Sequence, residues 1–178
     1  MATSGWPCYN GRMNTDLPVP AQFAHMAKAA CLLLMHPTDS ELFAVCSRRN
    51  STVHNFPGGK QDPGEVMAQT ASRETLEEIG VLTDPEDLEF LFADAIPGDT
   101  DYWVECFVAK SPTDVLVQME PGITVHWTNW AAFTQNNAFK DYNDAIHIAH
   151  RTWKECQRLG VPYVADLSHL STSPSPAV

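Results

Sequence analysis

Basic residues are scarce in this sequence. Only 11 Lys and Arg stand against 22 Asp and Glu in 178 residues, so the formal net charge is −11. A protein with this balance lacks the Lys/Arg clusters that attract a nucleic-acid backbone or an anionic membrane. We therefore expect neither a nucleic-acid polymer nor a membrane as partner. A small phosphorylated anion is still compatible with this charge, provided that a divalent cation reverses it locally.

Paired cysteines and long apolar runs are also missing. The five cysteines are scattered: Cys8, Cys31, Cys46, Cys106 and Cys156. They form no C-x-x-C pair, which argues against a structural zinc site and a disulfide framework. The longest apolar stretch, residues 29–35, is far shorter than the roughly 20 residues of a membrane span. Residues 1–20 show no basic segment followed by an apolar run, as a secretory signal would. These absences predict a protein of the reducing cytoplasm.

A single domain fits the length of the chain, at roughly 100–200 residues per domain. Residues 1–20 mix Gly, Pro, Asn and Thr without periodicity, which predicts an irregular lead-in. The Ser- and Pro-rich residues 168–178 cannot bury enough apolar surface to order themselves, which predicts a flexible tail. The domain is therefore expected to span residues 21–167.

Hydrophobic patterning predicts an α/β fold with a mixed sheet between helices. Apolar runs bounded by turn residues indicate strands at residues 27–36, 41–47, 88–93, 102–109 and 124–130. The first two are expected to pair as a hairpin. One helix is predicted over residues 64–79, ending at Gly80, which suits the left-handed position after a helix. A second helix stops at Gly160, before Pro162. Its apolar stripe has helical spacing and consists of Phe139, Tyr142, Ile146, Ala149, Trp153 and Cys156.

Three glutamates converge on one face of the first predicted helix. Glu74, Glu77 and Glu78 fall within an arc of roughly 100° at 3.6 residues per turn. Like charges at this spacing repel, and the C-terminal end of a helix disfavours anions further. A hard divalent cation with oxygen ligands would compensate for both effects. A solvated acidic face is the alternative. The face expected to be buried consists of Ala68, Thr75, Leu76 and Ile79.

The spacing around these carboxylates distinguishes the two explanations. From Gly59 the sequence runs through five residues to Glu65 and through seven more to Arg73-Glu74, followed by Thr-Leu-Glu-Glu-Ile-Gly-Val. This segment resembles the Nudix box, G-x5-E-x7-R-E-U-x-E-E-x-G-U, in which U is aliphatic. Every fixed position matches, and Phe-Pro-Gly precedes the box as it does in the family. The one departure is Thr75 at an aliphatic position, where its β-branched shape is kept.

The resemblance to Nudix hydrolases implies an α/β/α sandwich with a loop–helix–loop metal site. That site would cleave a pyrophosphate bond in a nucleoside diphosphate linked to another moiety. Glu74 and Glu78 would be the main ligands of Mg²⁺, for which Mn²⁺ can substitute. Glu77 would assist directly or through water, and the carbonyl of Gly58 would complete the set. Such cations neutralise bridging phosphates, position an attacking water and stabilise charge on the leaving oxygen.

The same resemblance implies supporting roles around the metal. Glu65 and Arg73 would orient the metal-binding glutamates. Arg73 would therefore count among the residues needed for catalysis. Relatives use either a box glutamate or an acidic residue on a later loop as the base. Glu74 is the first candidate, and Glu120, in a Glu-Pro-Gly stretch, is the second. A solvent-facing turn is the alternative for Glu120, and Glu105 is a weaker candidate.

Substrate-facing residues are suggested by comparison with MutT-like enzymes. Arg49 ends an Arg-Arg pair after the second strand, where such enzymes contact substrate phosphate; a strand-end charge facing water is the alternative. Asn143 lies at the start of the final helix. At this place MutT-like enzymes have an Asn that recognises a purine edge, because its side-chain amide can both donate and accept a hydrogen bond. A helix cap is its alternative role. Tyr102, Trp103 or Phe56 could stack on a base, although core packing is commoner for aromatic residues.

Two other motifs are weaker. His147 and His150 lie at helical spacing with Asp144 nearby, but no well-spaced third ligand supports a zinc site. Lys60 follows a Gly-Gly pair, yet Gln61 comes next, so the phosphate-binding pattern G-x4-G-K-[ST] is absent.

The sequence therefore predicts an Mg²⁺-dependent pyrophosphohydrolase. A (d)NTP, with 8-oxo-dGTP among the candidates, giving NMP and PPi is the leading substrate, favoured by Arg49 and Asn143. ADP-ribose, a dinucleotide or a nucleotide sugar is the alternative, because the box is common to all these activities. A catalytically silent nucleotide sensor is a second alternative, although silent relatives lose box carboxylates that are all present here. A homodimer is compatible with the resemblance.

Overall fold

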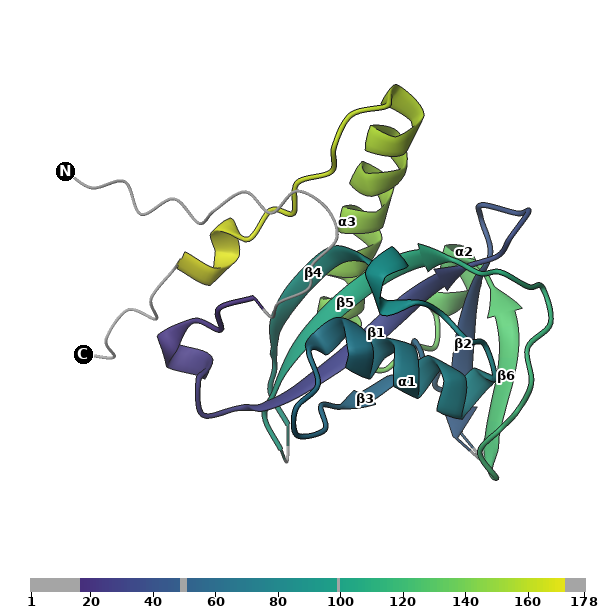
Figure 1. Ribbon diagram of the computed structural model, residues 1–178, viewed down its shortest axis with the longest axis horizontal. Helices are drawn as coiled ribbons and strands as arrows, with labels where there is room; N and C mark the ends of the chain where they lie inside the picture. Colours follow the sequence, from purple (N-terminus) through teal and green to yellow (C-terminus); the bar gives the residue numbers. More distant parts are fainter. Residues whose placement is uncertain (1–16, 49–50, 99, 172–178) are drawn as a thin grey trace.

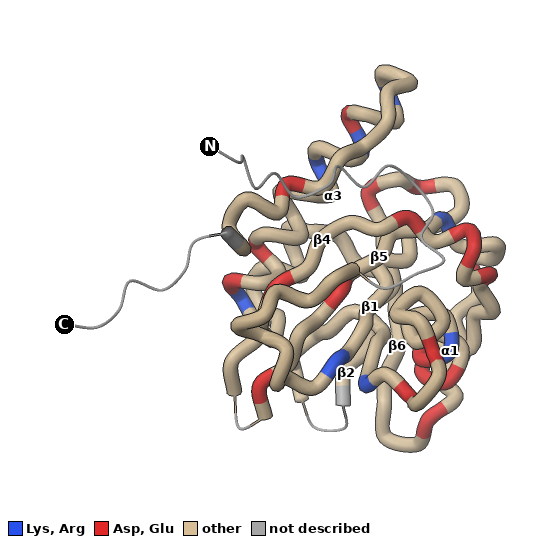
Figure 2. The backbone as a smooth tube through the Cα atoms, turned by 60° about the vertical axis from the view of Figure 1, so that its left-hand side comes forward, with Lys and Arg blue, Asp and Glu red and all other residues tan. Residues whose placement is uncertain are grey.

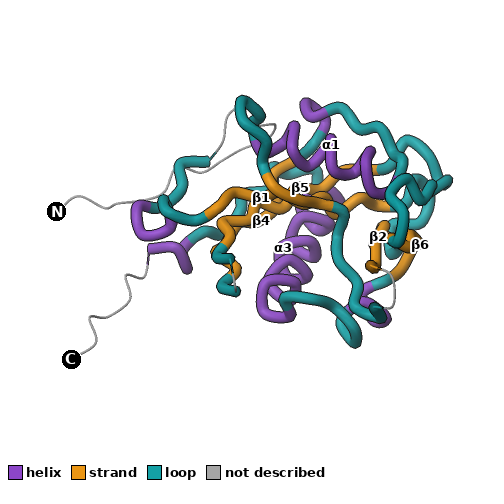
Figure 3. Tube along the Cα trace, turned by 90° about the horizontal axis from the view of Figure 1, so that it is seen from below, coloured by secondary structure: helices purple, strands orange, loops and turns teal. Residues whose placement is uncertain are grey.

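The computed structural model describes residues 17–48, 51–98 and 100–171. A six-stranded mixed sheet has the order β4-β5-β1-β2-β6, with the short β3 beside β1. Helices α1 and α3 cover opposite faces of this sheet (Figure 1, Figure 3). The predicted α/β sandwich is therefore confirmed. The elements are η1 Ala21–Phe23, β1 Ala27–Met35, β2 Phe43–Arg48, β3 Gly58–Lys60, α1 Met67–Ile79, η2 Pro85–Asp87, β4 Glu89–Ile96, β5 Tyr102–Lys110, β6 Ile123–Thr128, α2 Trp130–Phe133, α3 Lys140–Leu159 and η3 Ser168–Ser171.

Strand β1 lies at the centre of the sheet and is buried on both faces. Leu32 and Leu34 pack into the core beneath α1, whereas Leu33 and Met35 pack into the core beneath α3. A strand covered on both sides needs a continuous apolar run, which explains the longest apolar stretch of the sequence. β1 pairs antiparallel with β2, as predicted, and parallel with β5.

Helix α1 begins three residues later than predicted. Gly64 has φ +89°, a conformation outside the helical region, and the chain becomes helical only after Val66. The side chain of Gln69 accepts a hydrogen bond from the Val66 N–H at 2.9 Å and so satisfies one free donor at the helix start. Gly80 ends the helix in the left-handed conformation, φ 71°, as the sequence predicts.

One residue of the face expected to be buried on α1 is instead exposed. Leu76 is 39% exposed, whereas Ala68, Thr75 and Ile79 are buried. The Thr75 hydroxyl donates to the Ala71 carbonyl at 2.7 Å. The departure from the aliphatic pattern therefore leaves no unpaired hydroxyl in the core.

The buried stripe of α3 is confirmed for Tyr142, Ile146 and Trp153 but is wrong for Phe139. Phe139 is the N-cap, in the left-handed conformation, and is 57% exposed. The helical spacing therefore extended one residue too far, because periodicity does not show where the helical backbone begins.

Several features were not predicted from local pattern. β3 has only three residues, and its antiparallel pairing with β1 holds it in place. β6 ends at Thr128, two residues early, because the Asn129 side chain caps α2 by accepting from the Ala132 N–H. At the ends of the domain, Leu17 and Leu170 are buried in the core beneath α1. Ser168–Ser171, assigned above to the tail, thus form η3; the rest of the predicted tail lies outside the described residues.

Candidate active site

The box segment folds as β3, a loop and α1, and it brings two glycines against neighbouring groups. Gly58 pairs with Cys31 of β1, and a Cβ on Gly58 would lie 2.4 Å from the Ala30 carbonyl oxygen. A Cβ on Gly59 would lie 2.4 Å from Oε1 of Glu74. Real Cβ atoms do not approach neighbours this closely, so a side chain on Gly58 would meet the backbone of β1, whereas one on Gly59 would displace the Glu74 carboxylate. Close packing of this loop therefore places its backbone beside the carboxylates of α1.

Arg73 is the centre of a charged network on α1. Its Nε and Nη2 donate to the two carboxylate oxygens of Glu65, at 2.8 and 3.2 Å. Its Nη1 donates to Glu74 at 2.8 Å and to Glu77 at 3.1 Å, and Nη2 also donates to the Lys60 carbonyl at 2.9 Å. The hydrogen bonds from Arg73, and to a smaller extent those from Thr70 and the Asp62 N–H, lower the pKa of Glu65 to about 2. The guanidinium thus ties the loop to the helix and fixes the rotamers of three carboxylates.

Glu78 is the most enclosed of the three helix-face glutamates. Its Oε2 accepts hydrogen bonds from the Gly58 N–H at 3.0 Å and from the Cys46 thiol at 3.5 Å. Burial raises the pKa of Glu78 to about 7, and the negative charges of Glu74 and Glu120 act in the same direction. Burial likewise raises the pKa of Glu74, against the opposing effect of Arg73. Burial therefore disfavours the charged form of both carboxylates, although Glu74 has Arg73 as a cationic partner.

The donor set fits a hard divalent cation. Within the described residues, no group of three acidic, histidine or cysteine side chains is arranged to share one ion in this conformation. Arg73 holds Glu77 and one oxygen of Glu74. Even so, the half-buried carboxylates of Glu74 and Glu78 offer only oxygen ligands, which Mg²⁺ and Mn²⁺ prefer, and a cation would balance their negative charge. Figure 2 shows acidic residues gathered along α1 and the segments beside it.

The loop between β5 and β6 brings Glu120 to the same place. Its backbone runs along the end of α1, where the Val117 N–H donates to the Ile79 carbonyl at 2.9 Å. Glu120 is exposed and acts electrostatically on Glu78. By contrast, Glu105 is buried in β5, where it accepts a hydrogen bond from the Trp103 indole at 3.2 Å. The geometry thus keeps Glu120 as a candidate and removes Glu105.

A pocket of about 420 Å³ opens beside these carboxylates. Gly58, Gly59 and Glu78 lie on its wall, and Asn143 and Phe139, at the start of α3, lie on another part of it. The walls between are mainly apolar, with Ala29, Cys31, Ile96 and Val104 among them. An apolar cleft with a few convergent polar groups is typical of a site for a small organic ligand.

Asn143 does not cap α3, since Phe139 holds that position and Asn143 is the fourth helical residue. The Asn143 Nδ2 donates to Oδ1 of Asn137 at 3.1 Å and to the Ala138 carbonyl. The side chain is 4% exposed and lines the pocket. The capping alternative is therefore wrong. Arg49 lies outside the described residues.

The three aromatic residues predicted to stack on a base have different surroundings. Tyr102 lines the pocket, with the Lys60 ammonium 5.7 Å from its ring centroid. Phe56 also lines the pocket but is buried against Phe43 and Phe133. Trp103 is buried in the core beneath α1, stacked on Phe23, so it is no candidate. Phe139 was missed as a pocket residue because its spacing matches the buried stripe.

The histidines of α3 form no zinc site. The His150 Nδ1 accepts from the Trp130 indole at 3.1 Å, and the His147 ring stacks on the same indole with centroids 4.3 Å apart. Asp144 pairs with Lys140. These contacts assign the histidines to aromatic packing between α2 and α3.

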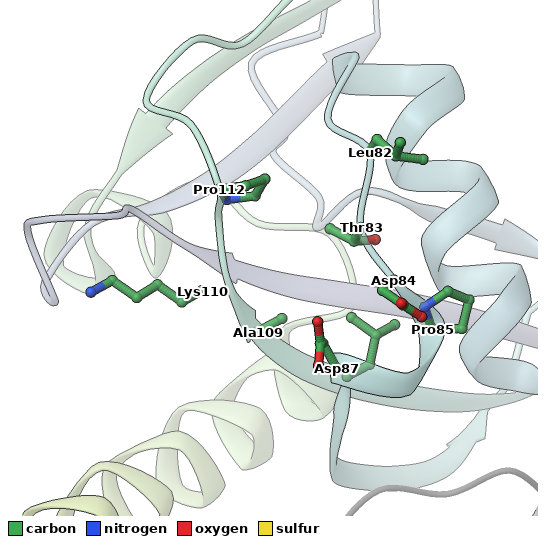
Figure 4. A pocket seen from close by; sticks show the side chains of 9 residues that line it. Leu82, Thr83, Asp84, Pro85, Asp87, Ala109, Lys110 and Pro112 are labelled. Carbon is green, nitrogen blue, oxygen red and sulfur yellow. The ribbon is translucent and has the colours of Figure 1, made fainter.

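A larger hollow of about 520 Å³ lies beyond the end of α1, between η2 and the end of β5. Figure 4 shows its lining, with Thr83, Asp84 and Pro85 on one side and Ala109, Lys110 and Pro112 on the other. None of its lining residues belongs to the box. The smaller pocket is therefore the candidate active site, since it alone of the two contains Glu78 and the paired glycines.

Comparisons with known proteins agree with this geometry. A family model described as the NUDIX domain matches residues 25–151, more than half of the chain. A segment of 26 residues is 69% identical to Nudix hydrolase 3 of Caenorhabditis elegans, and covers 15% of this chain and 11% of that protein.

Two solved structures show the same fold. The NUDIX domain of Shewanella oneidensis NrtR, complexed with ADP ribose, is similar with a TM-score of 0.59 at 20% identity, over 78% of this chain and 93% of that one. A C. elegans Ap4A hydrolase in a binary complex is similar with a TM-score of 0.56 at 21% identity. The similarity covers 75% of this chain and 99% of that chain. Separately, no helix within residues 17–48, 51–98 and 100–171 is both long and apolar enough to cross a membrane.

Proposed function

Because this chain belongs to the Nudix hydrolase family, we propose that it is a divalent-cation-dependent pyrophosphohydrolase of a small nucleotide. The substrate would be a nucleoside diphosphate linked to another group. A (d)NTP that yields NMP and PPi is the leading candidate. The observation that carries the proposal is the position of two half-buried carboxylates, Glu74 beside Gly59 and Glu78 beside Gly58, next to an apolar pocket that Glu78 lines.

The box residues would hold the cation. Glu74 and Glu78 would be its main ligands, with Glu77 and the Gly58 carbonyl as further oxygen donors. Bound Mg²⁺, or Mn²⁺ in its place, would supply charge neutralisation for the bridging phosphates. Through the contacts described above, Arg73 would keep Glu74 and Glu77 in position and Glu65 would keep Arg73 in position.

The remaining residues would act on water and on the nucleotide. Glu74 would take the proton as water attacks phosphorus and the pyrophosphate P–O bond breaks, with Glu120 as the second candidate for that base. Asn143 and Phe139 lie on another part of the pocket wall, where they would contact the nucleoside. Arg49, which lies outside the described residues, remains proposed to contact a phosphate.

ADP-ribose or a dinucleoside polyphosphate is the second candidate substrate. It is favoured by the similarity to one structure with ADP ribose and to one Ap4A hydrolase. Nucleotide sugars belong with these second candidate substrates. A silent nucleotide sensor is less consistent with the retained carboxylates, all three of which are present on α1.

Product analysis by liquid chromatography tests the proposal. The protein is incubated with Mg²⁺ and (d)NTPs, 8-oxo-dGTP, ADP-ribose, diadenosine polyphosphates and nucleotide sugars, beside Glu78→Gln. We expect conversion of one class, with kcat lowered by roughly 100-fold or more in Glu78→Gln, because the variant loses a charged ligand while keeping its shape. Glu155→Gln is the matched control, since Glu155 is an exposed carboxylate on α3 paired with Arg158. Binding without conversion would support the sensor instead.

A further inference from the structure

The side-chain amide of Asn143 has both N–H groups committed within the protein. One points to the Asn137 side-chain oxygen and the other to the Ala138 carbonyl. A backbone carbonyl can only accept, so this contact fixes which end of the amide is nitrogen. The expectation that Asn143 donates and accepts at once toward a purine therefore does not hold in this structure.

The oxygen of the same amide is left for a ligand. Among the residues that the structure describes, no donor contacts Oδ1 of Asn143. Asn143 is 4% exposed, so it is nine-tenths or more buried. Its Oδ1 is nevertheless not among the described polar atoms that are both unpartnered and fully inaccessible, so a ligand can reach it. Asn143 lines a mainly apolar pocket. A poorly hydrated acceptor of this kind gains most from a ligand that donates to it.

Phe139 adds an independent observation at the same pocket. With φ 56° and ψ 52°, it is the one non-glycine residue with positive φ in the described part of the chain. A bulky side chain is uncommon in this conformation, and strain of this kind collects at ligand sites. Glycine or asparagine would start α3 with less strain. The exposed phenyl ring on the pocket wall is therefore not explained by the needs of the helix.

We propose that this part of the pocket favours a nucleobase that donates a hydrogen bond through an exocyclic 6-amino group. The base would donate to Oδ1 of Asn143 and lie against the ring of Phe139. The 6-amino group of adenine meets this requirement, whereas guanine has the acceptor O6 at that position and would have to donate from its N1–H and N2–H2 edge in another orientation. The inference rests on the proposed function and adds the class of base that the site takes.

Nucleoside 5′-monophosphates test the selection without turnover. Titration calorimetry compares AMP with purine riboside 5′-monophosphate, which differs only by lacking the 6-amino group. We expect AMP to bind the wild-type chain about tenfold more tightly, as one hydrogen bond to a poorly hydrated acceptor provides. Equal affinities would overturn the proposal. In Asn143→Leu the difference should vanish; a difference that persists in a folded variant would also overturn it.

Phe139→Gly tests the stacking contact. Glycine tolerates positive φ, so the variant should melt at the same temperature as the wild type or higher, while binding both monophosphates several-fold more weakly. Unchanged binding would refute the stacking role. The outcome is separable from the proposed function: hydrolysis with equal binding of the two monophosphates refutes only the base selection. Preference for AMP without hydrolysis of any nucleotide refutes only the enzyme.

Discussion

The carboxylate of Glu74 occupies the space that a side chain on Gly59 would need. A Cβ there would lie 2.4 Å from Oε1 of Glu74, whereas a Cβ on Gly58 would lie 2.4 Å from the backbone oxygen of Ala30. The two adjacent glycines thus serve different purposes. One makes room for a functional side chain, and the other allows β3 to approach β1.

Alanine substitutions should separate these two purposes. In Gly59→Ala the end of a flexible side chain can move away, so we expect little loss of stability but at least about tenfold lower kcat as Glu74 is displaced. In Gly58→Ala the backbone of β1 cannot move as easily, so we expect a loss of about 1–3 kcal/mol in the free energy of unfolding. Urea titration and product assays measure both. Full activity in Gly59→Ala would contradict the role of Glu74.

Replacement of Arg73 should uncouple the carboxylates from one another. Arg73→Gln removes the contacts to Glu65, Glu74 and Glu77, and we expect activity to fall by about 10–100-fold, as for the loss of residues that orient metal ligands. The unfolding free energy should fall by about 1–3 kcal/mol, because partly buried carboxylates lose their partner. Arg73→Lys should recover the charge but not the forked geometry, and so restore activity only in part. Arg158→Gln, at an exposed pair on α3, is the control and should change neither quantity.

Cation binding can be measured apart from catalysis. Electron paramagnetic resonance of Mn²⁺ should show binding to the wild-type chain and weaker binding, by about tenfold or more, in Glu74→Gln and Glu78→Gln. Glu155→Gln should bind as the wild type does. Chelation by EDTA should stop any hydrolysis, and Mg²⁺ or Mn²⁺ should restore it. Equal Mn²⁺ affinity in all four proteins would exclude Glu74 and Glu78 as ligands.

His150 should make the fold sensitive to mild acid. Burial lowers the pKa of His150 to about 4, with Lys154 and His147 acting in the same direction and Glu41 opposing them. Its ordinary value is 6.5, so below that pH the unfolded chain binds a proton that the folded chain does not. The contribution to stability is complete above pH 6.5 and decreases as the pH falls toward 4, by up to about 3 kcal/mol.

Urea titrations between pH 7 and 4 test this dependence. His150→Asn keeps an acceptor for the Trp130 indole but cannot titrate, so its stability should change less with pH than that of the wild type. His25→Asn, at an exposed histidine, should keep the wild-type dependence. A parallel decrease in all three proteins would show that His150 is not the group responsible.

Local sequence was sufficient for the main elements of this fold. The apolar run of β1, the start of β5 at Tyr102 and the ends of α1 and α3 at Gly80 and Gly160 follow from patterning and turn chemistry. These features depend on a few neighbouring residues, which is why they can be predicted. β3 could not be, because three residues form a strand only when a partner strand is already present.

The candidate site divides in the same way. The spacing of Glu74, Glu77 and Glu78 on one helix determined that a cluster of carboxylates forms, since the helical repeat sets their separation. Only the tertiary structure decided that Glu120 joins them, that Glu105 is enclosed in the core and that Asn143 turns its N–H groups inward. Those outcomes depend on strand pairing and loop packing between residues far apart in the chain, and no local pattern encodes them.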